Sequence, residues 1–232
     1  MAVKVKICGL KTEAAVAAAL DAGADYVGFV FYSPSPRSVS PDVAASLARL
    51  ARGRARIVAL FVDPDDALLD EVVRKVEPDL IQLHGKETPE RVANIRARFG
   101  RPVMKAISVE TRADADRALS YRDAANLFLF DAKAPRELAG ALPGGNGIAF
   151  DWRALDGVRD KVRFMLSGGL NPGNVAEAIR LTAAEAVDVS SGVERSPGEK
   201  DDRLIEQFIA AAKGASGRAK QPAVVETRSA PA

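Results

Sequence analysis

The sequence is poor in the residues that build metal centres and disulfide frameworks. Its 232 residues include one cysteine, one histidine and one tryptophan. A structural zinc site takes three or four ligands, and a disulfide takes a pair of cysteines. The composition therefore excludes a disulfide framework and argues against a zinc site, so we expect no bound metal. A lone free thiol suits a reducing compartment, and we expect a cytoplasmic protein.

A strong charge of one sign and long apolar runs are also lacking. The chain has 33 basic and 31 acidic residues, a formal net charge of +2, which is too small to indicate a nucleic-acid partner. No run approaches the roughly 18 apolar residues of a membrane span. The N-terminal segment MAVKVKICGL is strand-like and lacks the apolar stretch of a secretory signal. We expect neither nucleic acid nor a membrane among the partners.

The chain instead alternates short apolar runs with segments of helical pattern. Most of the apolar runs are continuous, which is typical of strands that are covered on both faces. Successive runs are 23 to 37 residues apart, a period that suits one strand, one helix and two short loops. This spacing is counted from Val3, Tyr26, Ile57, Leu80, Val103, Leu127, Phe164 and Val187. We expect strands at Val3–Cys8, Tyr26–Phe31, Arg56–Val62, Leu80–His84, Pro102–Ile107, Leu127–Asp131, Phe164–Ser167 and Ala186–Ser190.

Several of the intervening helices have recognisable starts. Ser40-Pro41, Thr88-Pro89 and Asn171-Pro172 each combine a capping residue with a proline at the first helical position. Strict alternation of strands and helices implies an α/β fold with a parallel sheet.

Eight such units predict a single-domain (β/α)8 TIM barrel that covers residues 1–213. An open doubly wound sheet is the alternative, although no G-x-G-x-x-G follows the first strand. Residues 214–232 are mostly small and polar, and we expect a disordered C-terminal tail because they bury too little apolar area to offset ordering.

The expected strand ends carry a set of polar residues. In a barrel of this kind the active site lies at the C-terminal ends of the strands. The residues expected there are Cys8, Arg37, Gln82, His84, Lys105, Asp131, Ser167 and Asp188. Alternation along a strand places Lys6 on the same face as Cys8. A purely structural role is equally open for Lys6 and Lys105, as partners of carboxylates such as Asp188.

Two glycine loops follow the last two expected strands. The first contains Ser167-Gly168-Gly169, and the second contains Ser190-Ser191-Gly192. Glycines let backbone N–H groups approach an anion, and these two loops are the usual phosphate site of the barrel. We expect all six residues to bind phosphate; a simple tight turn is the alternative for the first loop.

Five motifs, in order along the chain, resemble those of the phosphoribosylanthranilate isomerase family. They are Lys6-Ile7-Cys8-Gly9, Gln82-Leu83-His84-Gly85, Phe130-Asp131, Leu166–Leu170, and Asp188–Glu194 followed by Pro197–Asp201. The resemblance implies an Amadori rearrangement of N-(5′-phosphoribosyl)anthranilate in tryptophan biosynthesis. The ligand would be a phosphorylated sugar amine, the enzyme a monomer or homodimer, and no cofactor would be required because the chemistry consists of proton transfers.

The resemblance also assigns roles to individual residues. By matching position, Cys8 would be the general base and Asp131 the general acid. Arg37 would bind the anthranilate carboxylate, and the remaining substrate contacts would be Gln82, His84 and Asp188. A free thiol titrates near pH ~8.5 and a free aspartic acid near ~3.9. We therefore expect basic neighbours that favour the thiolate of Cys8, and burial with nearby negative charge that keeps Asp131 protonated.

Other interpretations remain open from the sequence. Cys8 could be a small buried hydrophobe, and Asp131 a cap or turn residue. The chain could be the related histidine-pathway isomerase, whose family uses two aspartates, or a silent barrel that binds phosphorylated metabolites. Gly144–Gly147 could close over the phosphate as a mobile loop or be a plain connection.

Overall fold

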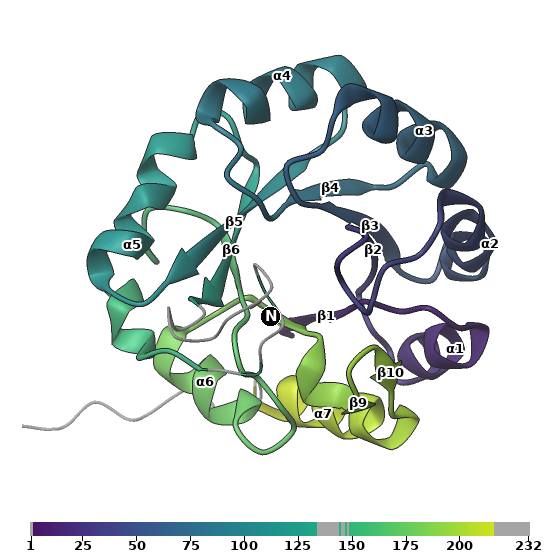
Figure 1. Cartoon of the computed structure of the whole chain (residues 1–232). Coiled ribbons are helices and arrows are strands. Elements are labelled where there is room, and N and C mark those ends of the chain that lie inside the picture. Colours follow the sequence, from purple (N-terminus) through teal and green to yellow (C-terminus); the bar gives the residue numbers. More distant parts are fainter. Residues whose placement is uncertain (1, 134–143, 145–146, 148, 216–232) are drawn as a thin grey trace, which may run out of the picture.

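Eight parallel strands close into a barrel, with the first strand paired to both the second and the last (Figure 1). The structure is a computed structural model that describes residues 2–133, 144, 147 and 149–215. The strands are β1 (Lys4–Cys8), β2 (Tyr26–Phe31), β3 (Arg56–Phe61), β4 (Leu80–Leu83), β5 (Val103–Val109), β6 (Leu127–Ala132), β7 (Phe164–Leu166) and β8 (Ala186–Val189). The predicted (β/α)8 barrel is confirmed, and every expected strand is present with its ends within two residues of those expected.

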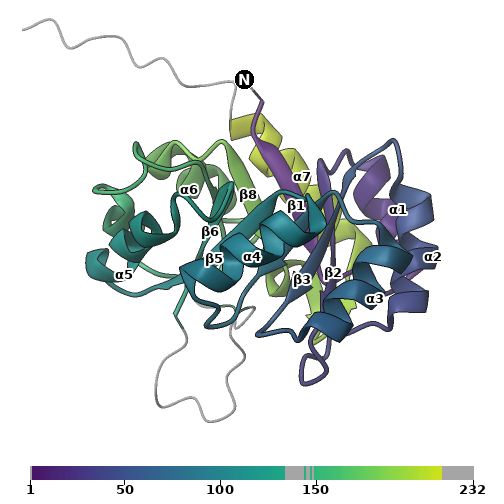
Figure 2. The same cartoon turned by 90° about the horizontal axis from the view of Figure 1, so that it is seen from above.

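The helices lie on the outside of the barrel (Figures 1 and 2). They are α1 (Glu13–Asp21), α2 (Pro41–Ala51), α3 (Asp66–Val76), α4 (Pro89–Phe99), α5 (Arg112–Asp116), α6 (Val175–Thr182) and α7 (Asp202–Ala215). Short 3₁₀ turns supplement them at η1 (Arg117–Tyr121), η2 (Trp152–Leu155) and η3 (Ser191–Val193). After η3, a small antiparallel hairpin of β9 (Glu194–Ser196) and β10 (Glu199–Lys200) precedes α7. The sequence pattern did not predict this hairpin.

The expected helix starts are confirmed at two of the three serine, threonine or asparagine positions followed by proline. Ser40 accepts a hydrogen bond from the N–H of Val43, and Thr88 caps α4 in the same way. The prediction at Asn171 was wrong. Its side chain instead accepts from the N–H of Gly173, which makes a local turn, and α6 begins only at Val175. Asparagine side chains form such turns readily, and the turn delays the helix.

Side chains inside the barrel change from apolar to polar along its axis. Nearer the N-terminal ends of the strands they form a cluster of Tyr26, Val58, Leu80, Met104, Ala106, Leu129, Met165 and Ala186. Two residues further along the same faces come Gln82 and Asp188, both buried. The outward faces pack against the helices in the larger apolar core. A buried polar layer therefore lies directly beneath the C-terminal ends of the strands.

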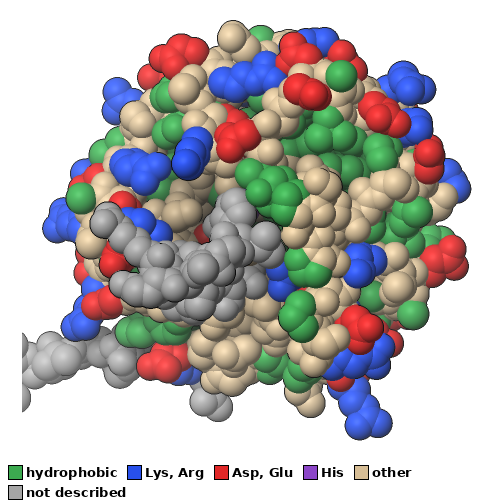
Figure 3. Space-filling view, in the orientation of Figure 1, with side chains coloured by type: hydrophobic (Ala, Val, Ile, Leu, Met, Phe, Trp, Pro, Cys, Tyr) green, Lys and Arg blue, Asp and Glu red, His purple; other side chains and the backbone are tan. Residues whose placement is uncertain are grey.

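The described surface mixes charges of both signs. Around the rim of the barrel, basic and acidic side chains are interspersed in the view of Figure 3. Among the described residues, no helix combines the length and the apolar character needed to cross a bilayer.

Helix α7 ends near the N-terminal ends of the strands, opposite the polar layer. Ala215 lies with Val3 and Lys4, at the start of β1 (Figure 2). Lys213 anchors the last turn of the helix by donating to the carbonyl of Gly23. The predicted tail begins inside this helix, at Gly214, and its residues 216–232 lie outside the described part of the chain.

We expect truncation after Lys213 to leave activity and the melting temperature nearly unchanged. The truncated chain keeps the Lys213 anchor, and the removed residues start far from the polar layer. Thermal unfolding should show a shift of no more than about 2 °C, because little apolar area is lost. A decrease of many degrees would show that the tail packs on the barrel.

Candidate active site

A pocket opens at the C-terminal ends of the strands, with about 650 Å³ of empty space when the solvent at its mouth is included. Of the twelve expected site residues, eleven line it: Cys8, Arg37, Gln82, His84, Asp131, Ser167, Gly168, Gly169, Asp188, Ser190 and Ser191. The twelfth, Gly192, does not. The pocket also has an apolar wall, made by Val30, Tyr32, Leu60 and Val62, which was not predicted from the sequence. Inward alternation at the ends of β2 and β3 was the signal that could have indicated it.

Cys8 is buried at the end of β1, where a glycine on the neighbouring strand makes room for it. A Cβ atom added at Gly28 would lie 3.1 Å from the Cys8 sulfur and 3.2 Å from the Lys6 ammonium. Burial raises the pKa of the Cys8 thiol, and the carboxylate of Asp188 adds to this; Lys6 and Lys200 act in the opposite direction. The expected basic neighbours are therefore present, but desolvation outweighs their effect on the pKa of the thiol.

Lys6 and Asp188 form a buried ion pair beneath the cysteine. The ammonium lies 2.9 Å from Asp188 Oδ1, and Ser167 donates to Oδ2 at 3.3 Å. Burial acts to lower the pKa of Lys6, but the charges of Asp188 and Cys8 outweigh it, so the pKa is raised. The structural pairing considered for Lys6 is confirmed. Asp188 faces the pocket with both of its oxygen atoms already engaged.

Asp131, His84 and Gln82 lie in a row on the other side of the pocket. Asp131 Oδ2 lies 3.3 Å from His84 Nε2, and its Oδ1 accepts from the N–H of Ala132. The amide nitrogen of Gln82 lies 3.1 Å from His84 Nδ1. Because an amide NH₂ only donates, a neutral His84 then carries its ring proton on Nε2, towards Asp131.

Two atoms of this row lack a hydrogen bond. Gln82 Oε1 and His84 Nε2 are buried, and neither has a hydrogen-bond partner among the described residues. Buried polar atoms are normally satisfied, by protein, water or a ligand. Their place on the pocket wall fits the contact with substrate expected of both residues.

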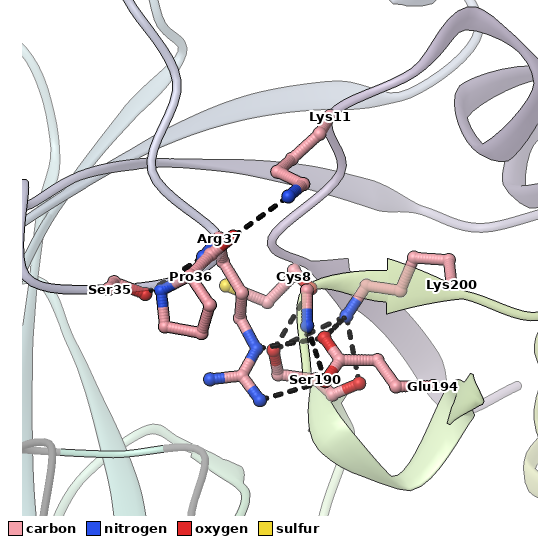
Figure 4. A network of polar contacts seen from close by, with 9 residues as sticks. Cys8, Lys11, Ser35, Pro36, Arg37, Ser190, Glu194 and Lys200 are labelled. Carbon is pink, nitrogen blue, oxygen red and sulfur yellow. Dashed lines mark hydrogen bonds and ion pairs between the residues drawn. The ribbon is translucent and has the colours of Figure 1, made fainter. Parts of the chain in front are cut away.

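Arg37 reaches the pocket from the loop between β2 and α2 and is held there by Glu194 (Figure 4). Its Nε and Nη2 atoms each lie 2.8 Å from an oxygen of the Glu194 carboxylate. The structure thus pairs Arg37 with a carboxylate of the chain itself, which the sequence analysis did not foresee.

Lys105, expected among the strand-end residues, does not reach the pocket. It points outward from β5, because its neighbour Met104 points inward. Its ammonium lies 2.9 Å from Glu87 and donates to the carbonyl of Gly85 at 2.8 Å. Lys105 therefore holds the loop that follows β4, next to His84.

The two glycine loops lie side by side at the pocket. Gly168 and Gly169 both have positive φ, +86° and +62°, which favours glycine. Within the described residues, the N–H groups of Gly168, Gly169 and Ser191 donate to no protein acceptor. A Cβ atom at Gly192 would overlap the carbonyl oxygen of Leu170. The close contact between the two loops therefore requires glycine at position 192.

Two further expectations concern a loop and a metal. Of Gly144–Gly147, only Gly144 and Gly147 are described, so the proposed loop closure lies largely outside the described residues. Gly144 itself lines the pocket, against Asp131 and His84. The described residues contain no group of three or more histidine, cysteine or acidic side chains that could hold a metal ion.

We expect Lys6→Met to lower the free energy of unfolding by about 3–5 kcal/mol, because it leaves the buried carboxylate of Asp188 unpaired. Urea denaturation measures the change. Lys4→Met, an exposed position on the same strand, is the control and should have little effect. A loss below about 1 kcal/mol for Lys6→Met would mean that Asp188 is readily solvated or protonated.

Comparison with known proteins agrees with this geometry. Residues 5–211 match the family model of N-(5′-phosphoribosyl)anthranilate (PRA) isomerase. The N-(5′-phosphoribosyl)anthranilate isomerase of Parvibaculum lavamentivorans is 56% identical over 215 residues, covering 93% of this chain and all of the relative. The Brucella canis enzyme of the same name is 53% identical over 218 residues, covering 94% of this chain and 97% of that protein.

Solved structures give the same result. Phosphoribosyl anthranilate isomerase from Thermotoga maritima superposes with a TM-score of 0.82 at 39% identity, over 91% of this chain and 99% of that one. A second structure, of a phosphoribosyl anthranilate isomerase in complex with reduced 1-(o-carboxyphenylamino)-1-deoxyribulose 5-phosphate, has a TM-score of 0.79 at 38% identity, with the same coverage. The chain therefore belongs to the N-(5′-phosphoribosyl)anthranilate isomerase family.

Proposed function

We propose that this chain converts N-(5′-phosphoribosyl)anthranilate into 1-(2-carboxyphenylamino)-1-deoxyribulose 5-phosphate, with Asp131 as general acid and Cys8 as general base. The family makes the chain an isomerase of tryptophan biosynthesis. The assignment of roles rests on one observation: Cys8, from β1, and Asp131, from β6, line the same pocket.

The acid step opens the sugar ring. Asp131 gives its proton to the furanose ring oxygen as the bond from that oxygen to C1′ breaks, and the lone pair of the anthranilate nitrogen forms a C=N bond. The product is a cationic Schiff base. The N–H of Ala132 donates to Asp131 Oδ1, and the ring of His84 lies 3.3 Å from Oδ2, so both groups limit the orientations that the carboxyl group can take for this transfer.

The base step moves a proton from carbon. The Cys8 thiolate removes the proton on C2′, and the electron pair of that C–H bond forms a C1′=C2′ double bond while the nitrogen becomes neutral. The resulting enolamine takes up a proton at C1′ and releases the proton of its C2′ hydroxyl, which gives the ketose. The cationic Schiff base itself favours the thiolate, because it adds a positive charge beside Cys8 just before the proton is removed.

The remaining pocket residues match the other parts of such a ligand. The apolar wall of Val30, Leu60 and Val62 suits an aromatic ring, and Arg37 suits its carboxylate. The N–H groups of Gly169 and Ser191 suit the phosphate. The relative in complex with reduced 1-(o-carboxyphenylamino)-1-deoxyribulose 5-phosphate binds a ligand with all three of these parts.

The same chemistry bears on cofactors and on cellular location. The two steps consist of proton transfers that Cys8 and Asp131 can carry out, so the reaction should proceed without a metal or organic cofactor. Cys8 has to remain a reduced thiol to act as a base, which suits the cytoplasm. The chain is expected to act as a monomer or a homodimer.

We expect Cys8→Ala and Asp131→Asn each to lower turnover by at least ~10²-fold, the lower range of what a positioned acid or base contributes. Loss of the substrate's anthranilate fluorescence, followed with purified protein, measures the reaction. Binding of the reduced product analogue should persist in both variants, because neither residue is proposed to hold the phosphate or the carboxylate. A Cys8→Ala protein that retains most of its turnover would overturn the mechanism.

We also expect kcat/KM to rise with pH as Cys8 loses its proton. Because burial raises the pKa of the thiol in the free enzyme, the midpoint of this rise should lie above the pH ~8.5 of an ordinary thiol. A pH series of initial rates at low substrate concentration gives the midpoint. A rise centred below ~8.5, or one that persists in Cys8→Ala, would contradict the assignment of Cys8 as the base.

A further inference from the structure

Two buried charged side chains lie next to the pocket and take no part in the steps above. The side chains of Glu194 and Lys200 are only 4% and 2% exposed, and Lys200 Nζ lies 2.8 Å from Glu194 Oε1. Neither residue is among those that line the pocket. Burial of charge is costly even when the charges are paired. A functional role for the Glu194–Lys200 pair would account for this cost.

Lys200 connects the hairpin to the main chain of the proposed base. Its ammonium donates to the carbonyl oxygen of Ser190 at 2.8 Å and contacts the Ser190 hydroxyl at 3.4 Å. That hydroxyl in turn donates to the carbonyl of Cys8 at 3.2 Å (Figure 4). Burial lowers the pKa of Lys200, while the charge of Glu194 opposes the decrease.

Glu194 connects the same hairpin to the guanidinium of Arg37. Its two carboxylate oxygens accept from Nε and Nη2, along one edge of the guanidinium (Figure 4). The N–H of Gly198 and the ammonium of Lys200 hold the carboxylate from other directions. A guanidinium is planar and rigid, so fixing one edge also fixes the direction of the edge that bears Nη1.

We propose that Glu194 and Lys200 are positioning residues for the isomerase reaction: Glu194 sets the plane in which Arg37 receives the carboxylate of the ligand, and Lys200 holds Glu194 and the Ser190–Cys8 main chain in one frame. This inference rests on the role proposed for Arg37. It accounts for the buried pair, because one carboxylate and one ammonium join two parts of the site, the guanidinium of Arg37 and the main chain of Cys8.

The test compares two ligands on matched variants. The probes are reduced 1-(2-carboxyphenylamino)-1-deoxyribulose 5-phosphate and the same molecule without the aromatic carboxylate, with Kd measured by calorimetry. In Glu194→Gln, the amide nitrogen faces one of the guanidinium donors, so the two-point contact is lost. Glu199→Gln is the control, because Glu199 lies in the same hairpin but is exposed and pairs with Arg195 at the surface.

We expect the unaltered protein and Glu199→Gln to prefer the carboxylated ligand by at least about 10-fold, the contribution of a charged hydrogen-bonded pair. In Glu194→Gln the preference should fall to about threefold or less, with little change in Kd for the ligand without carboxylate. Lys200→Met, which leaves Glu194 with one cation fewer, should reduce the preference in the same direction and provides the test should Glu194→Gln not fold.

The outcomes separate this inference from the proposed function. If the unaltered protein shows no preference for the carboxylated ligand, the role of Arg37 is wrong. If the preference exists and persists undiminished in Glu194→Gln and Lys200→Met, Arg37 keeps its role and the positioning role is wrong. A variant that weakens both ligands equally, with an unchanged ratio, would show a structural contribution only and would also overturn the inference.

Discussion

The ion pair between Lys6 and Asp188 spans the seam at which the barrel closes. The two residues lie opposite each other in the register of β1 and β8, so the ladder that joins the first and last strands also brings their charges together. A one-residue slip in this register would turn either side chain out of the barrel and leave its partner buried and unpaired. Closure and the polar floor of the pocket therefore depend on the same pairing.

The proposed catalytic arrangement is built on this polar floor. Cys8 lies on the same face as Lys6, two residues further along β1, and Gly28 on β2 leaves the space that both side chains occupy. Burial at this site raises the pKa of the Cys8 thiol, and the nearby ammonium groups of Lys6 and Lys200 oppose the increase. Asp131, on the opposite side of the pocket, contacts the N–H of Ala132 and the ring of His84. One pocket thus surrounds the proposed base and the proposed acid with different groups.

Support for the site comes from segments that lie outside the pocket. The β9–β10 hairpin supplies Glu194 and Lys200 to the Arg37 side, and Lys105 with Glu87 holds the loop next to His84. The Glu194–Lys200 and Glu87–Lys105 ion pairs are both buried, and in each the ammonium group also donates to a backbone carbonyl of a loop at the pocket. Paired charges of this kind specify geometry, because a carboxylate or a carbonyl can satisfy a buried ammonium only from a few directions.

The sequence by itself determined the barrel and most of the polar side chains that line its pocket, because period-2 alternation and the common edge of parallel strands decide which side chains gather at the C-terminal ends. Cys8, Asp131 and the glycine loops could be identified in this way. Only the tertiary structure showed that Arg37 pairs with Glu194, 157 residues away in the sequence, and that Lys105 points outward. Such contacts depend on how loops from different strands pack together, and a local sequence pattern does not predict that packing. The direction of the pKa shift of Cys8 was likewise decided by the fold, because desolvation depends on all the groups that surround the sulfur.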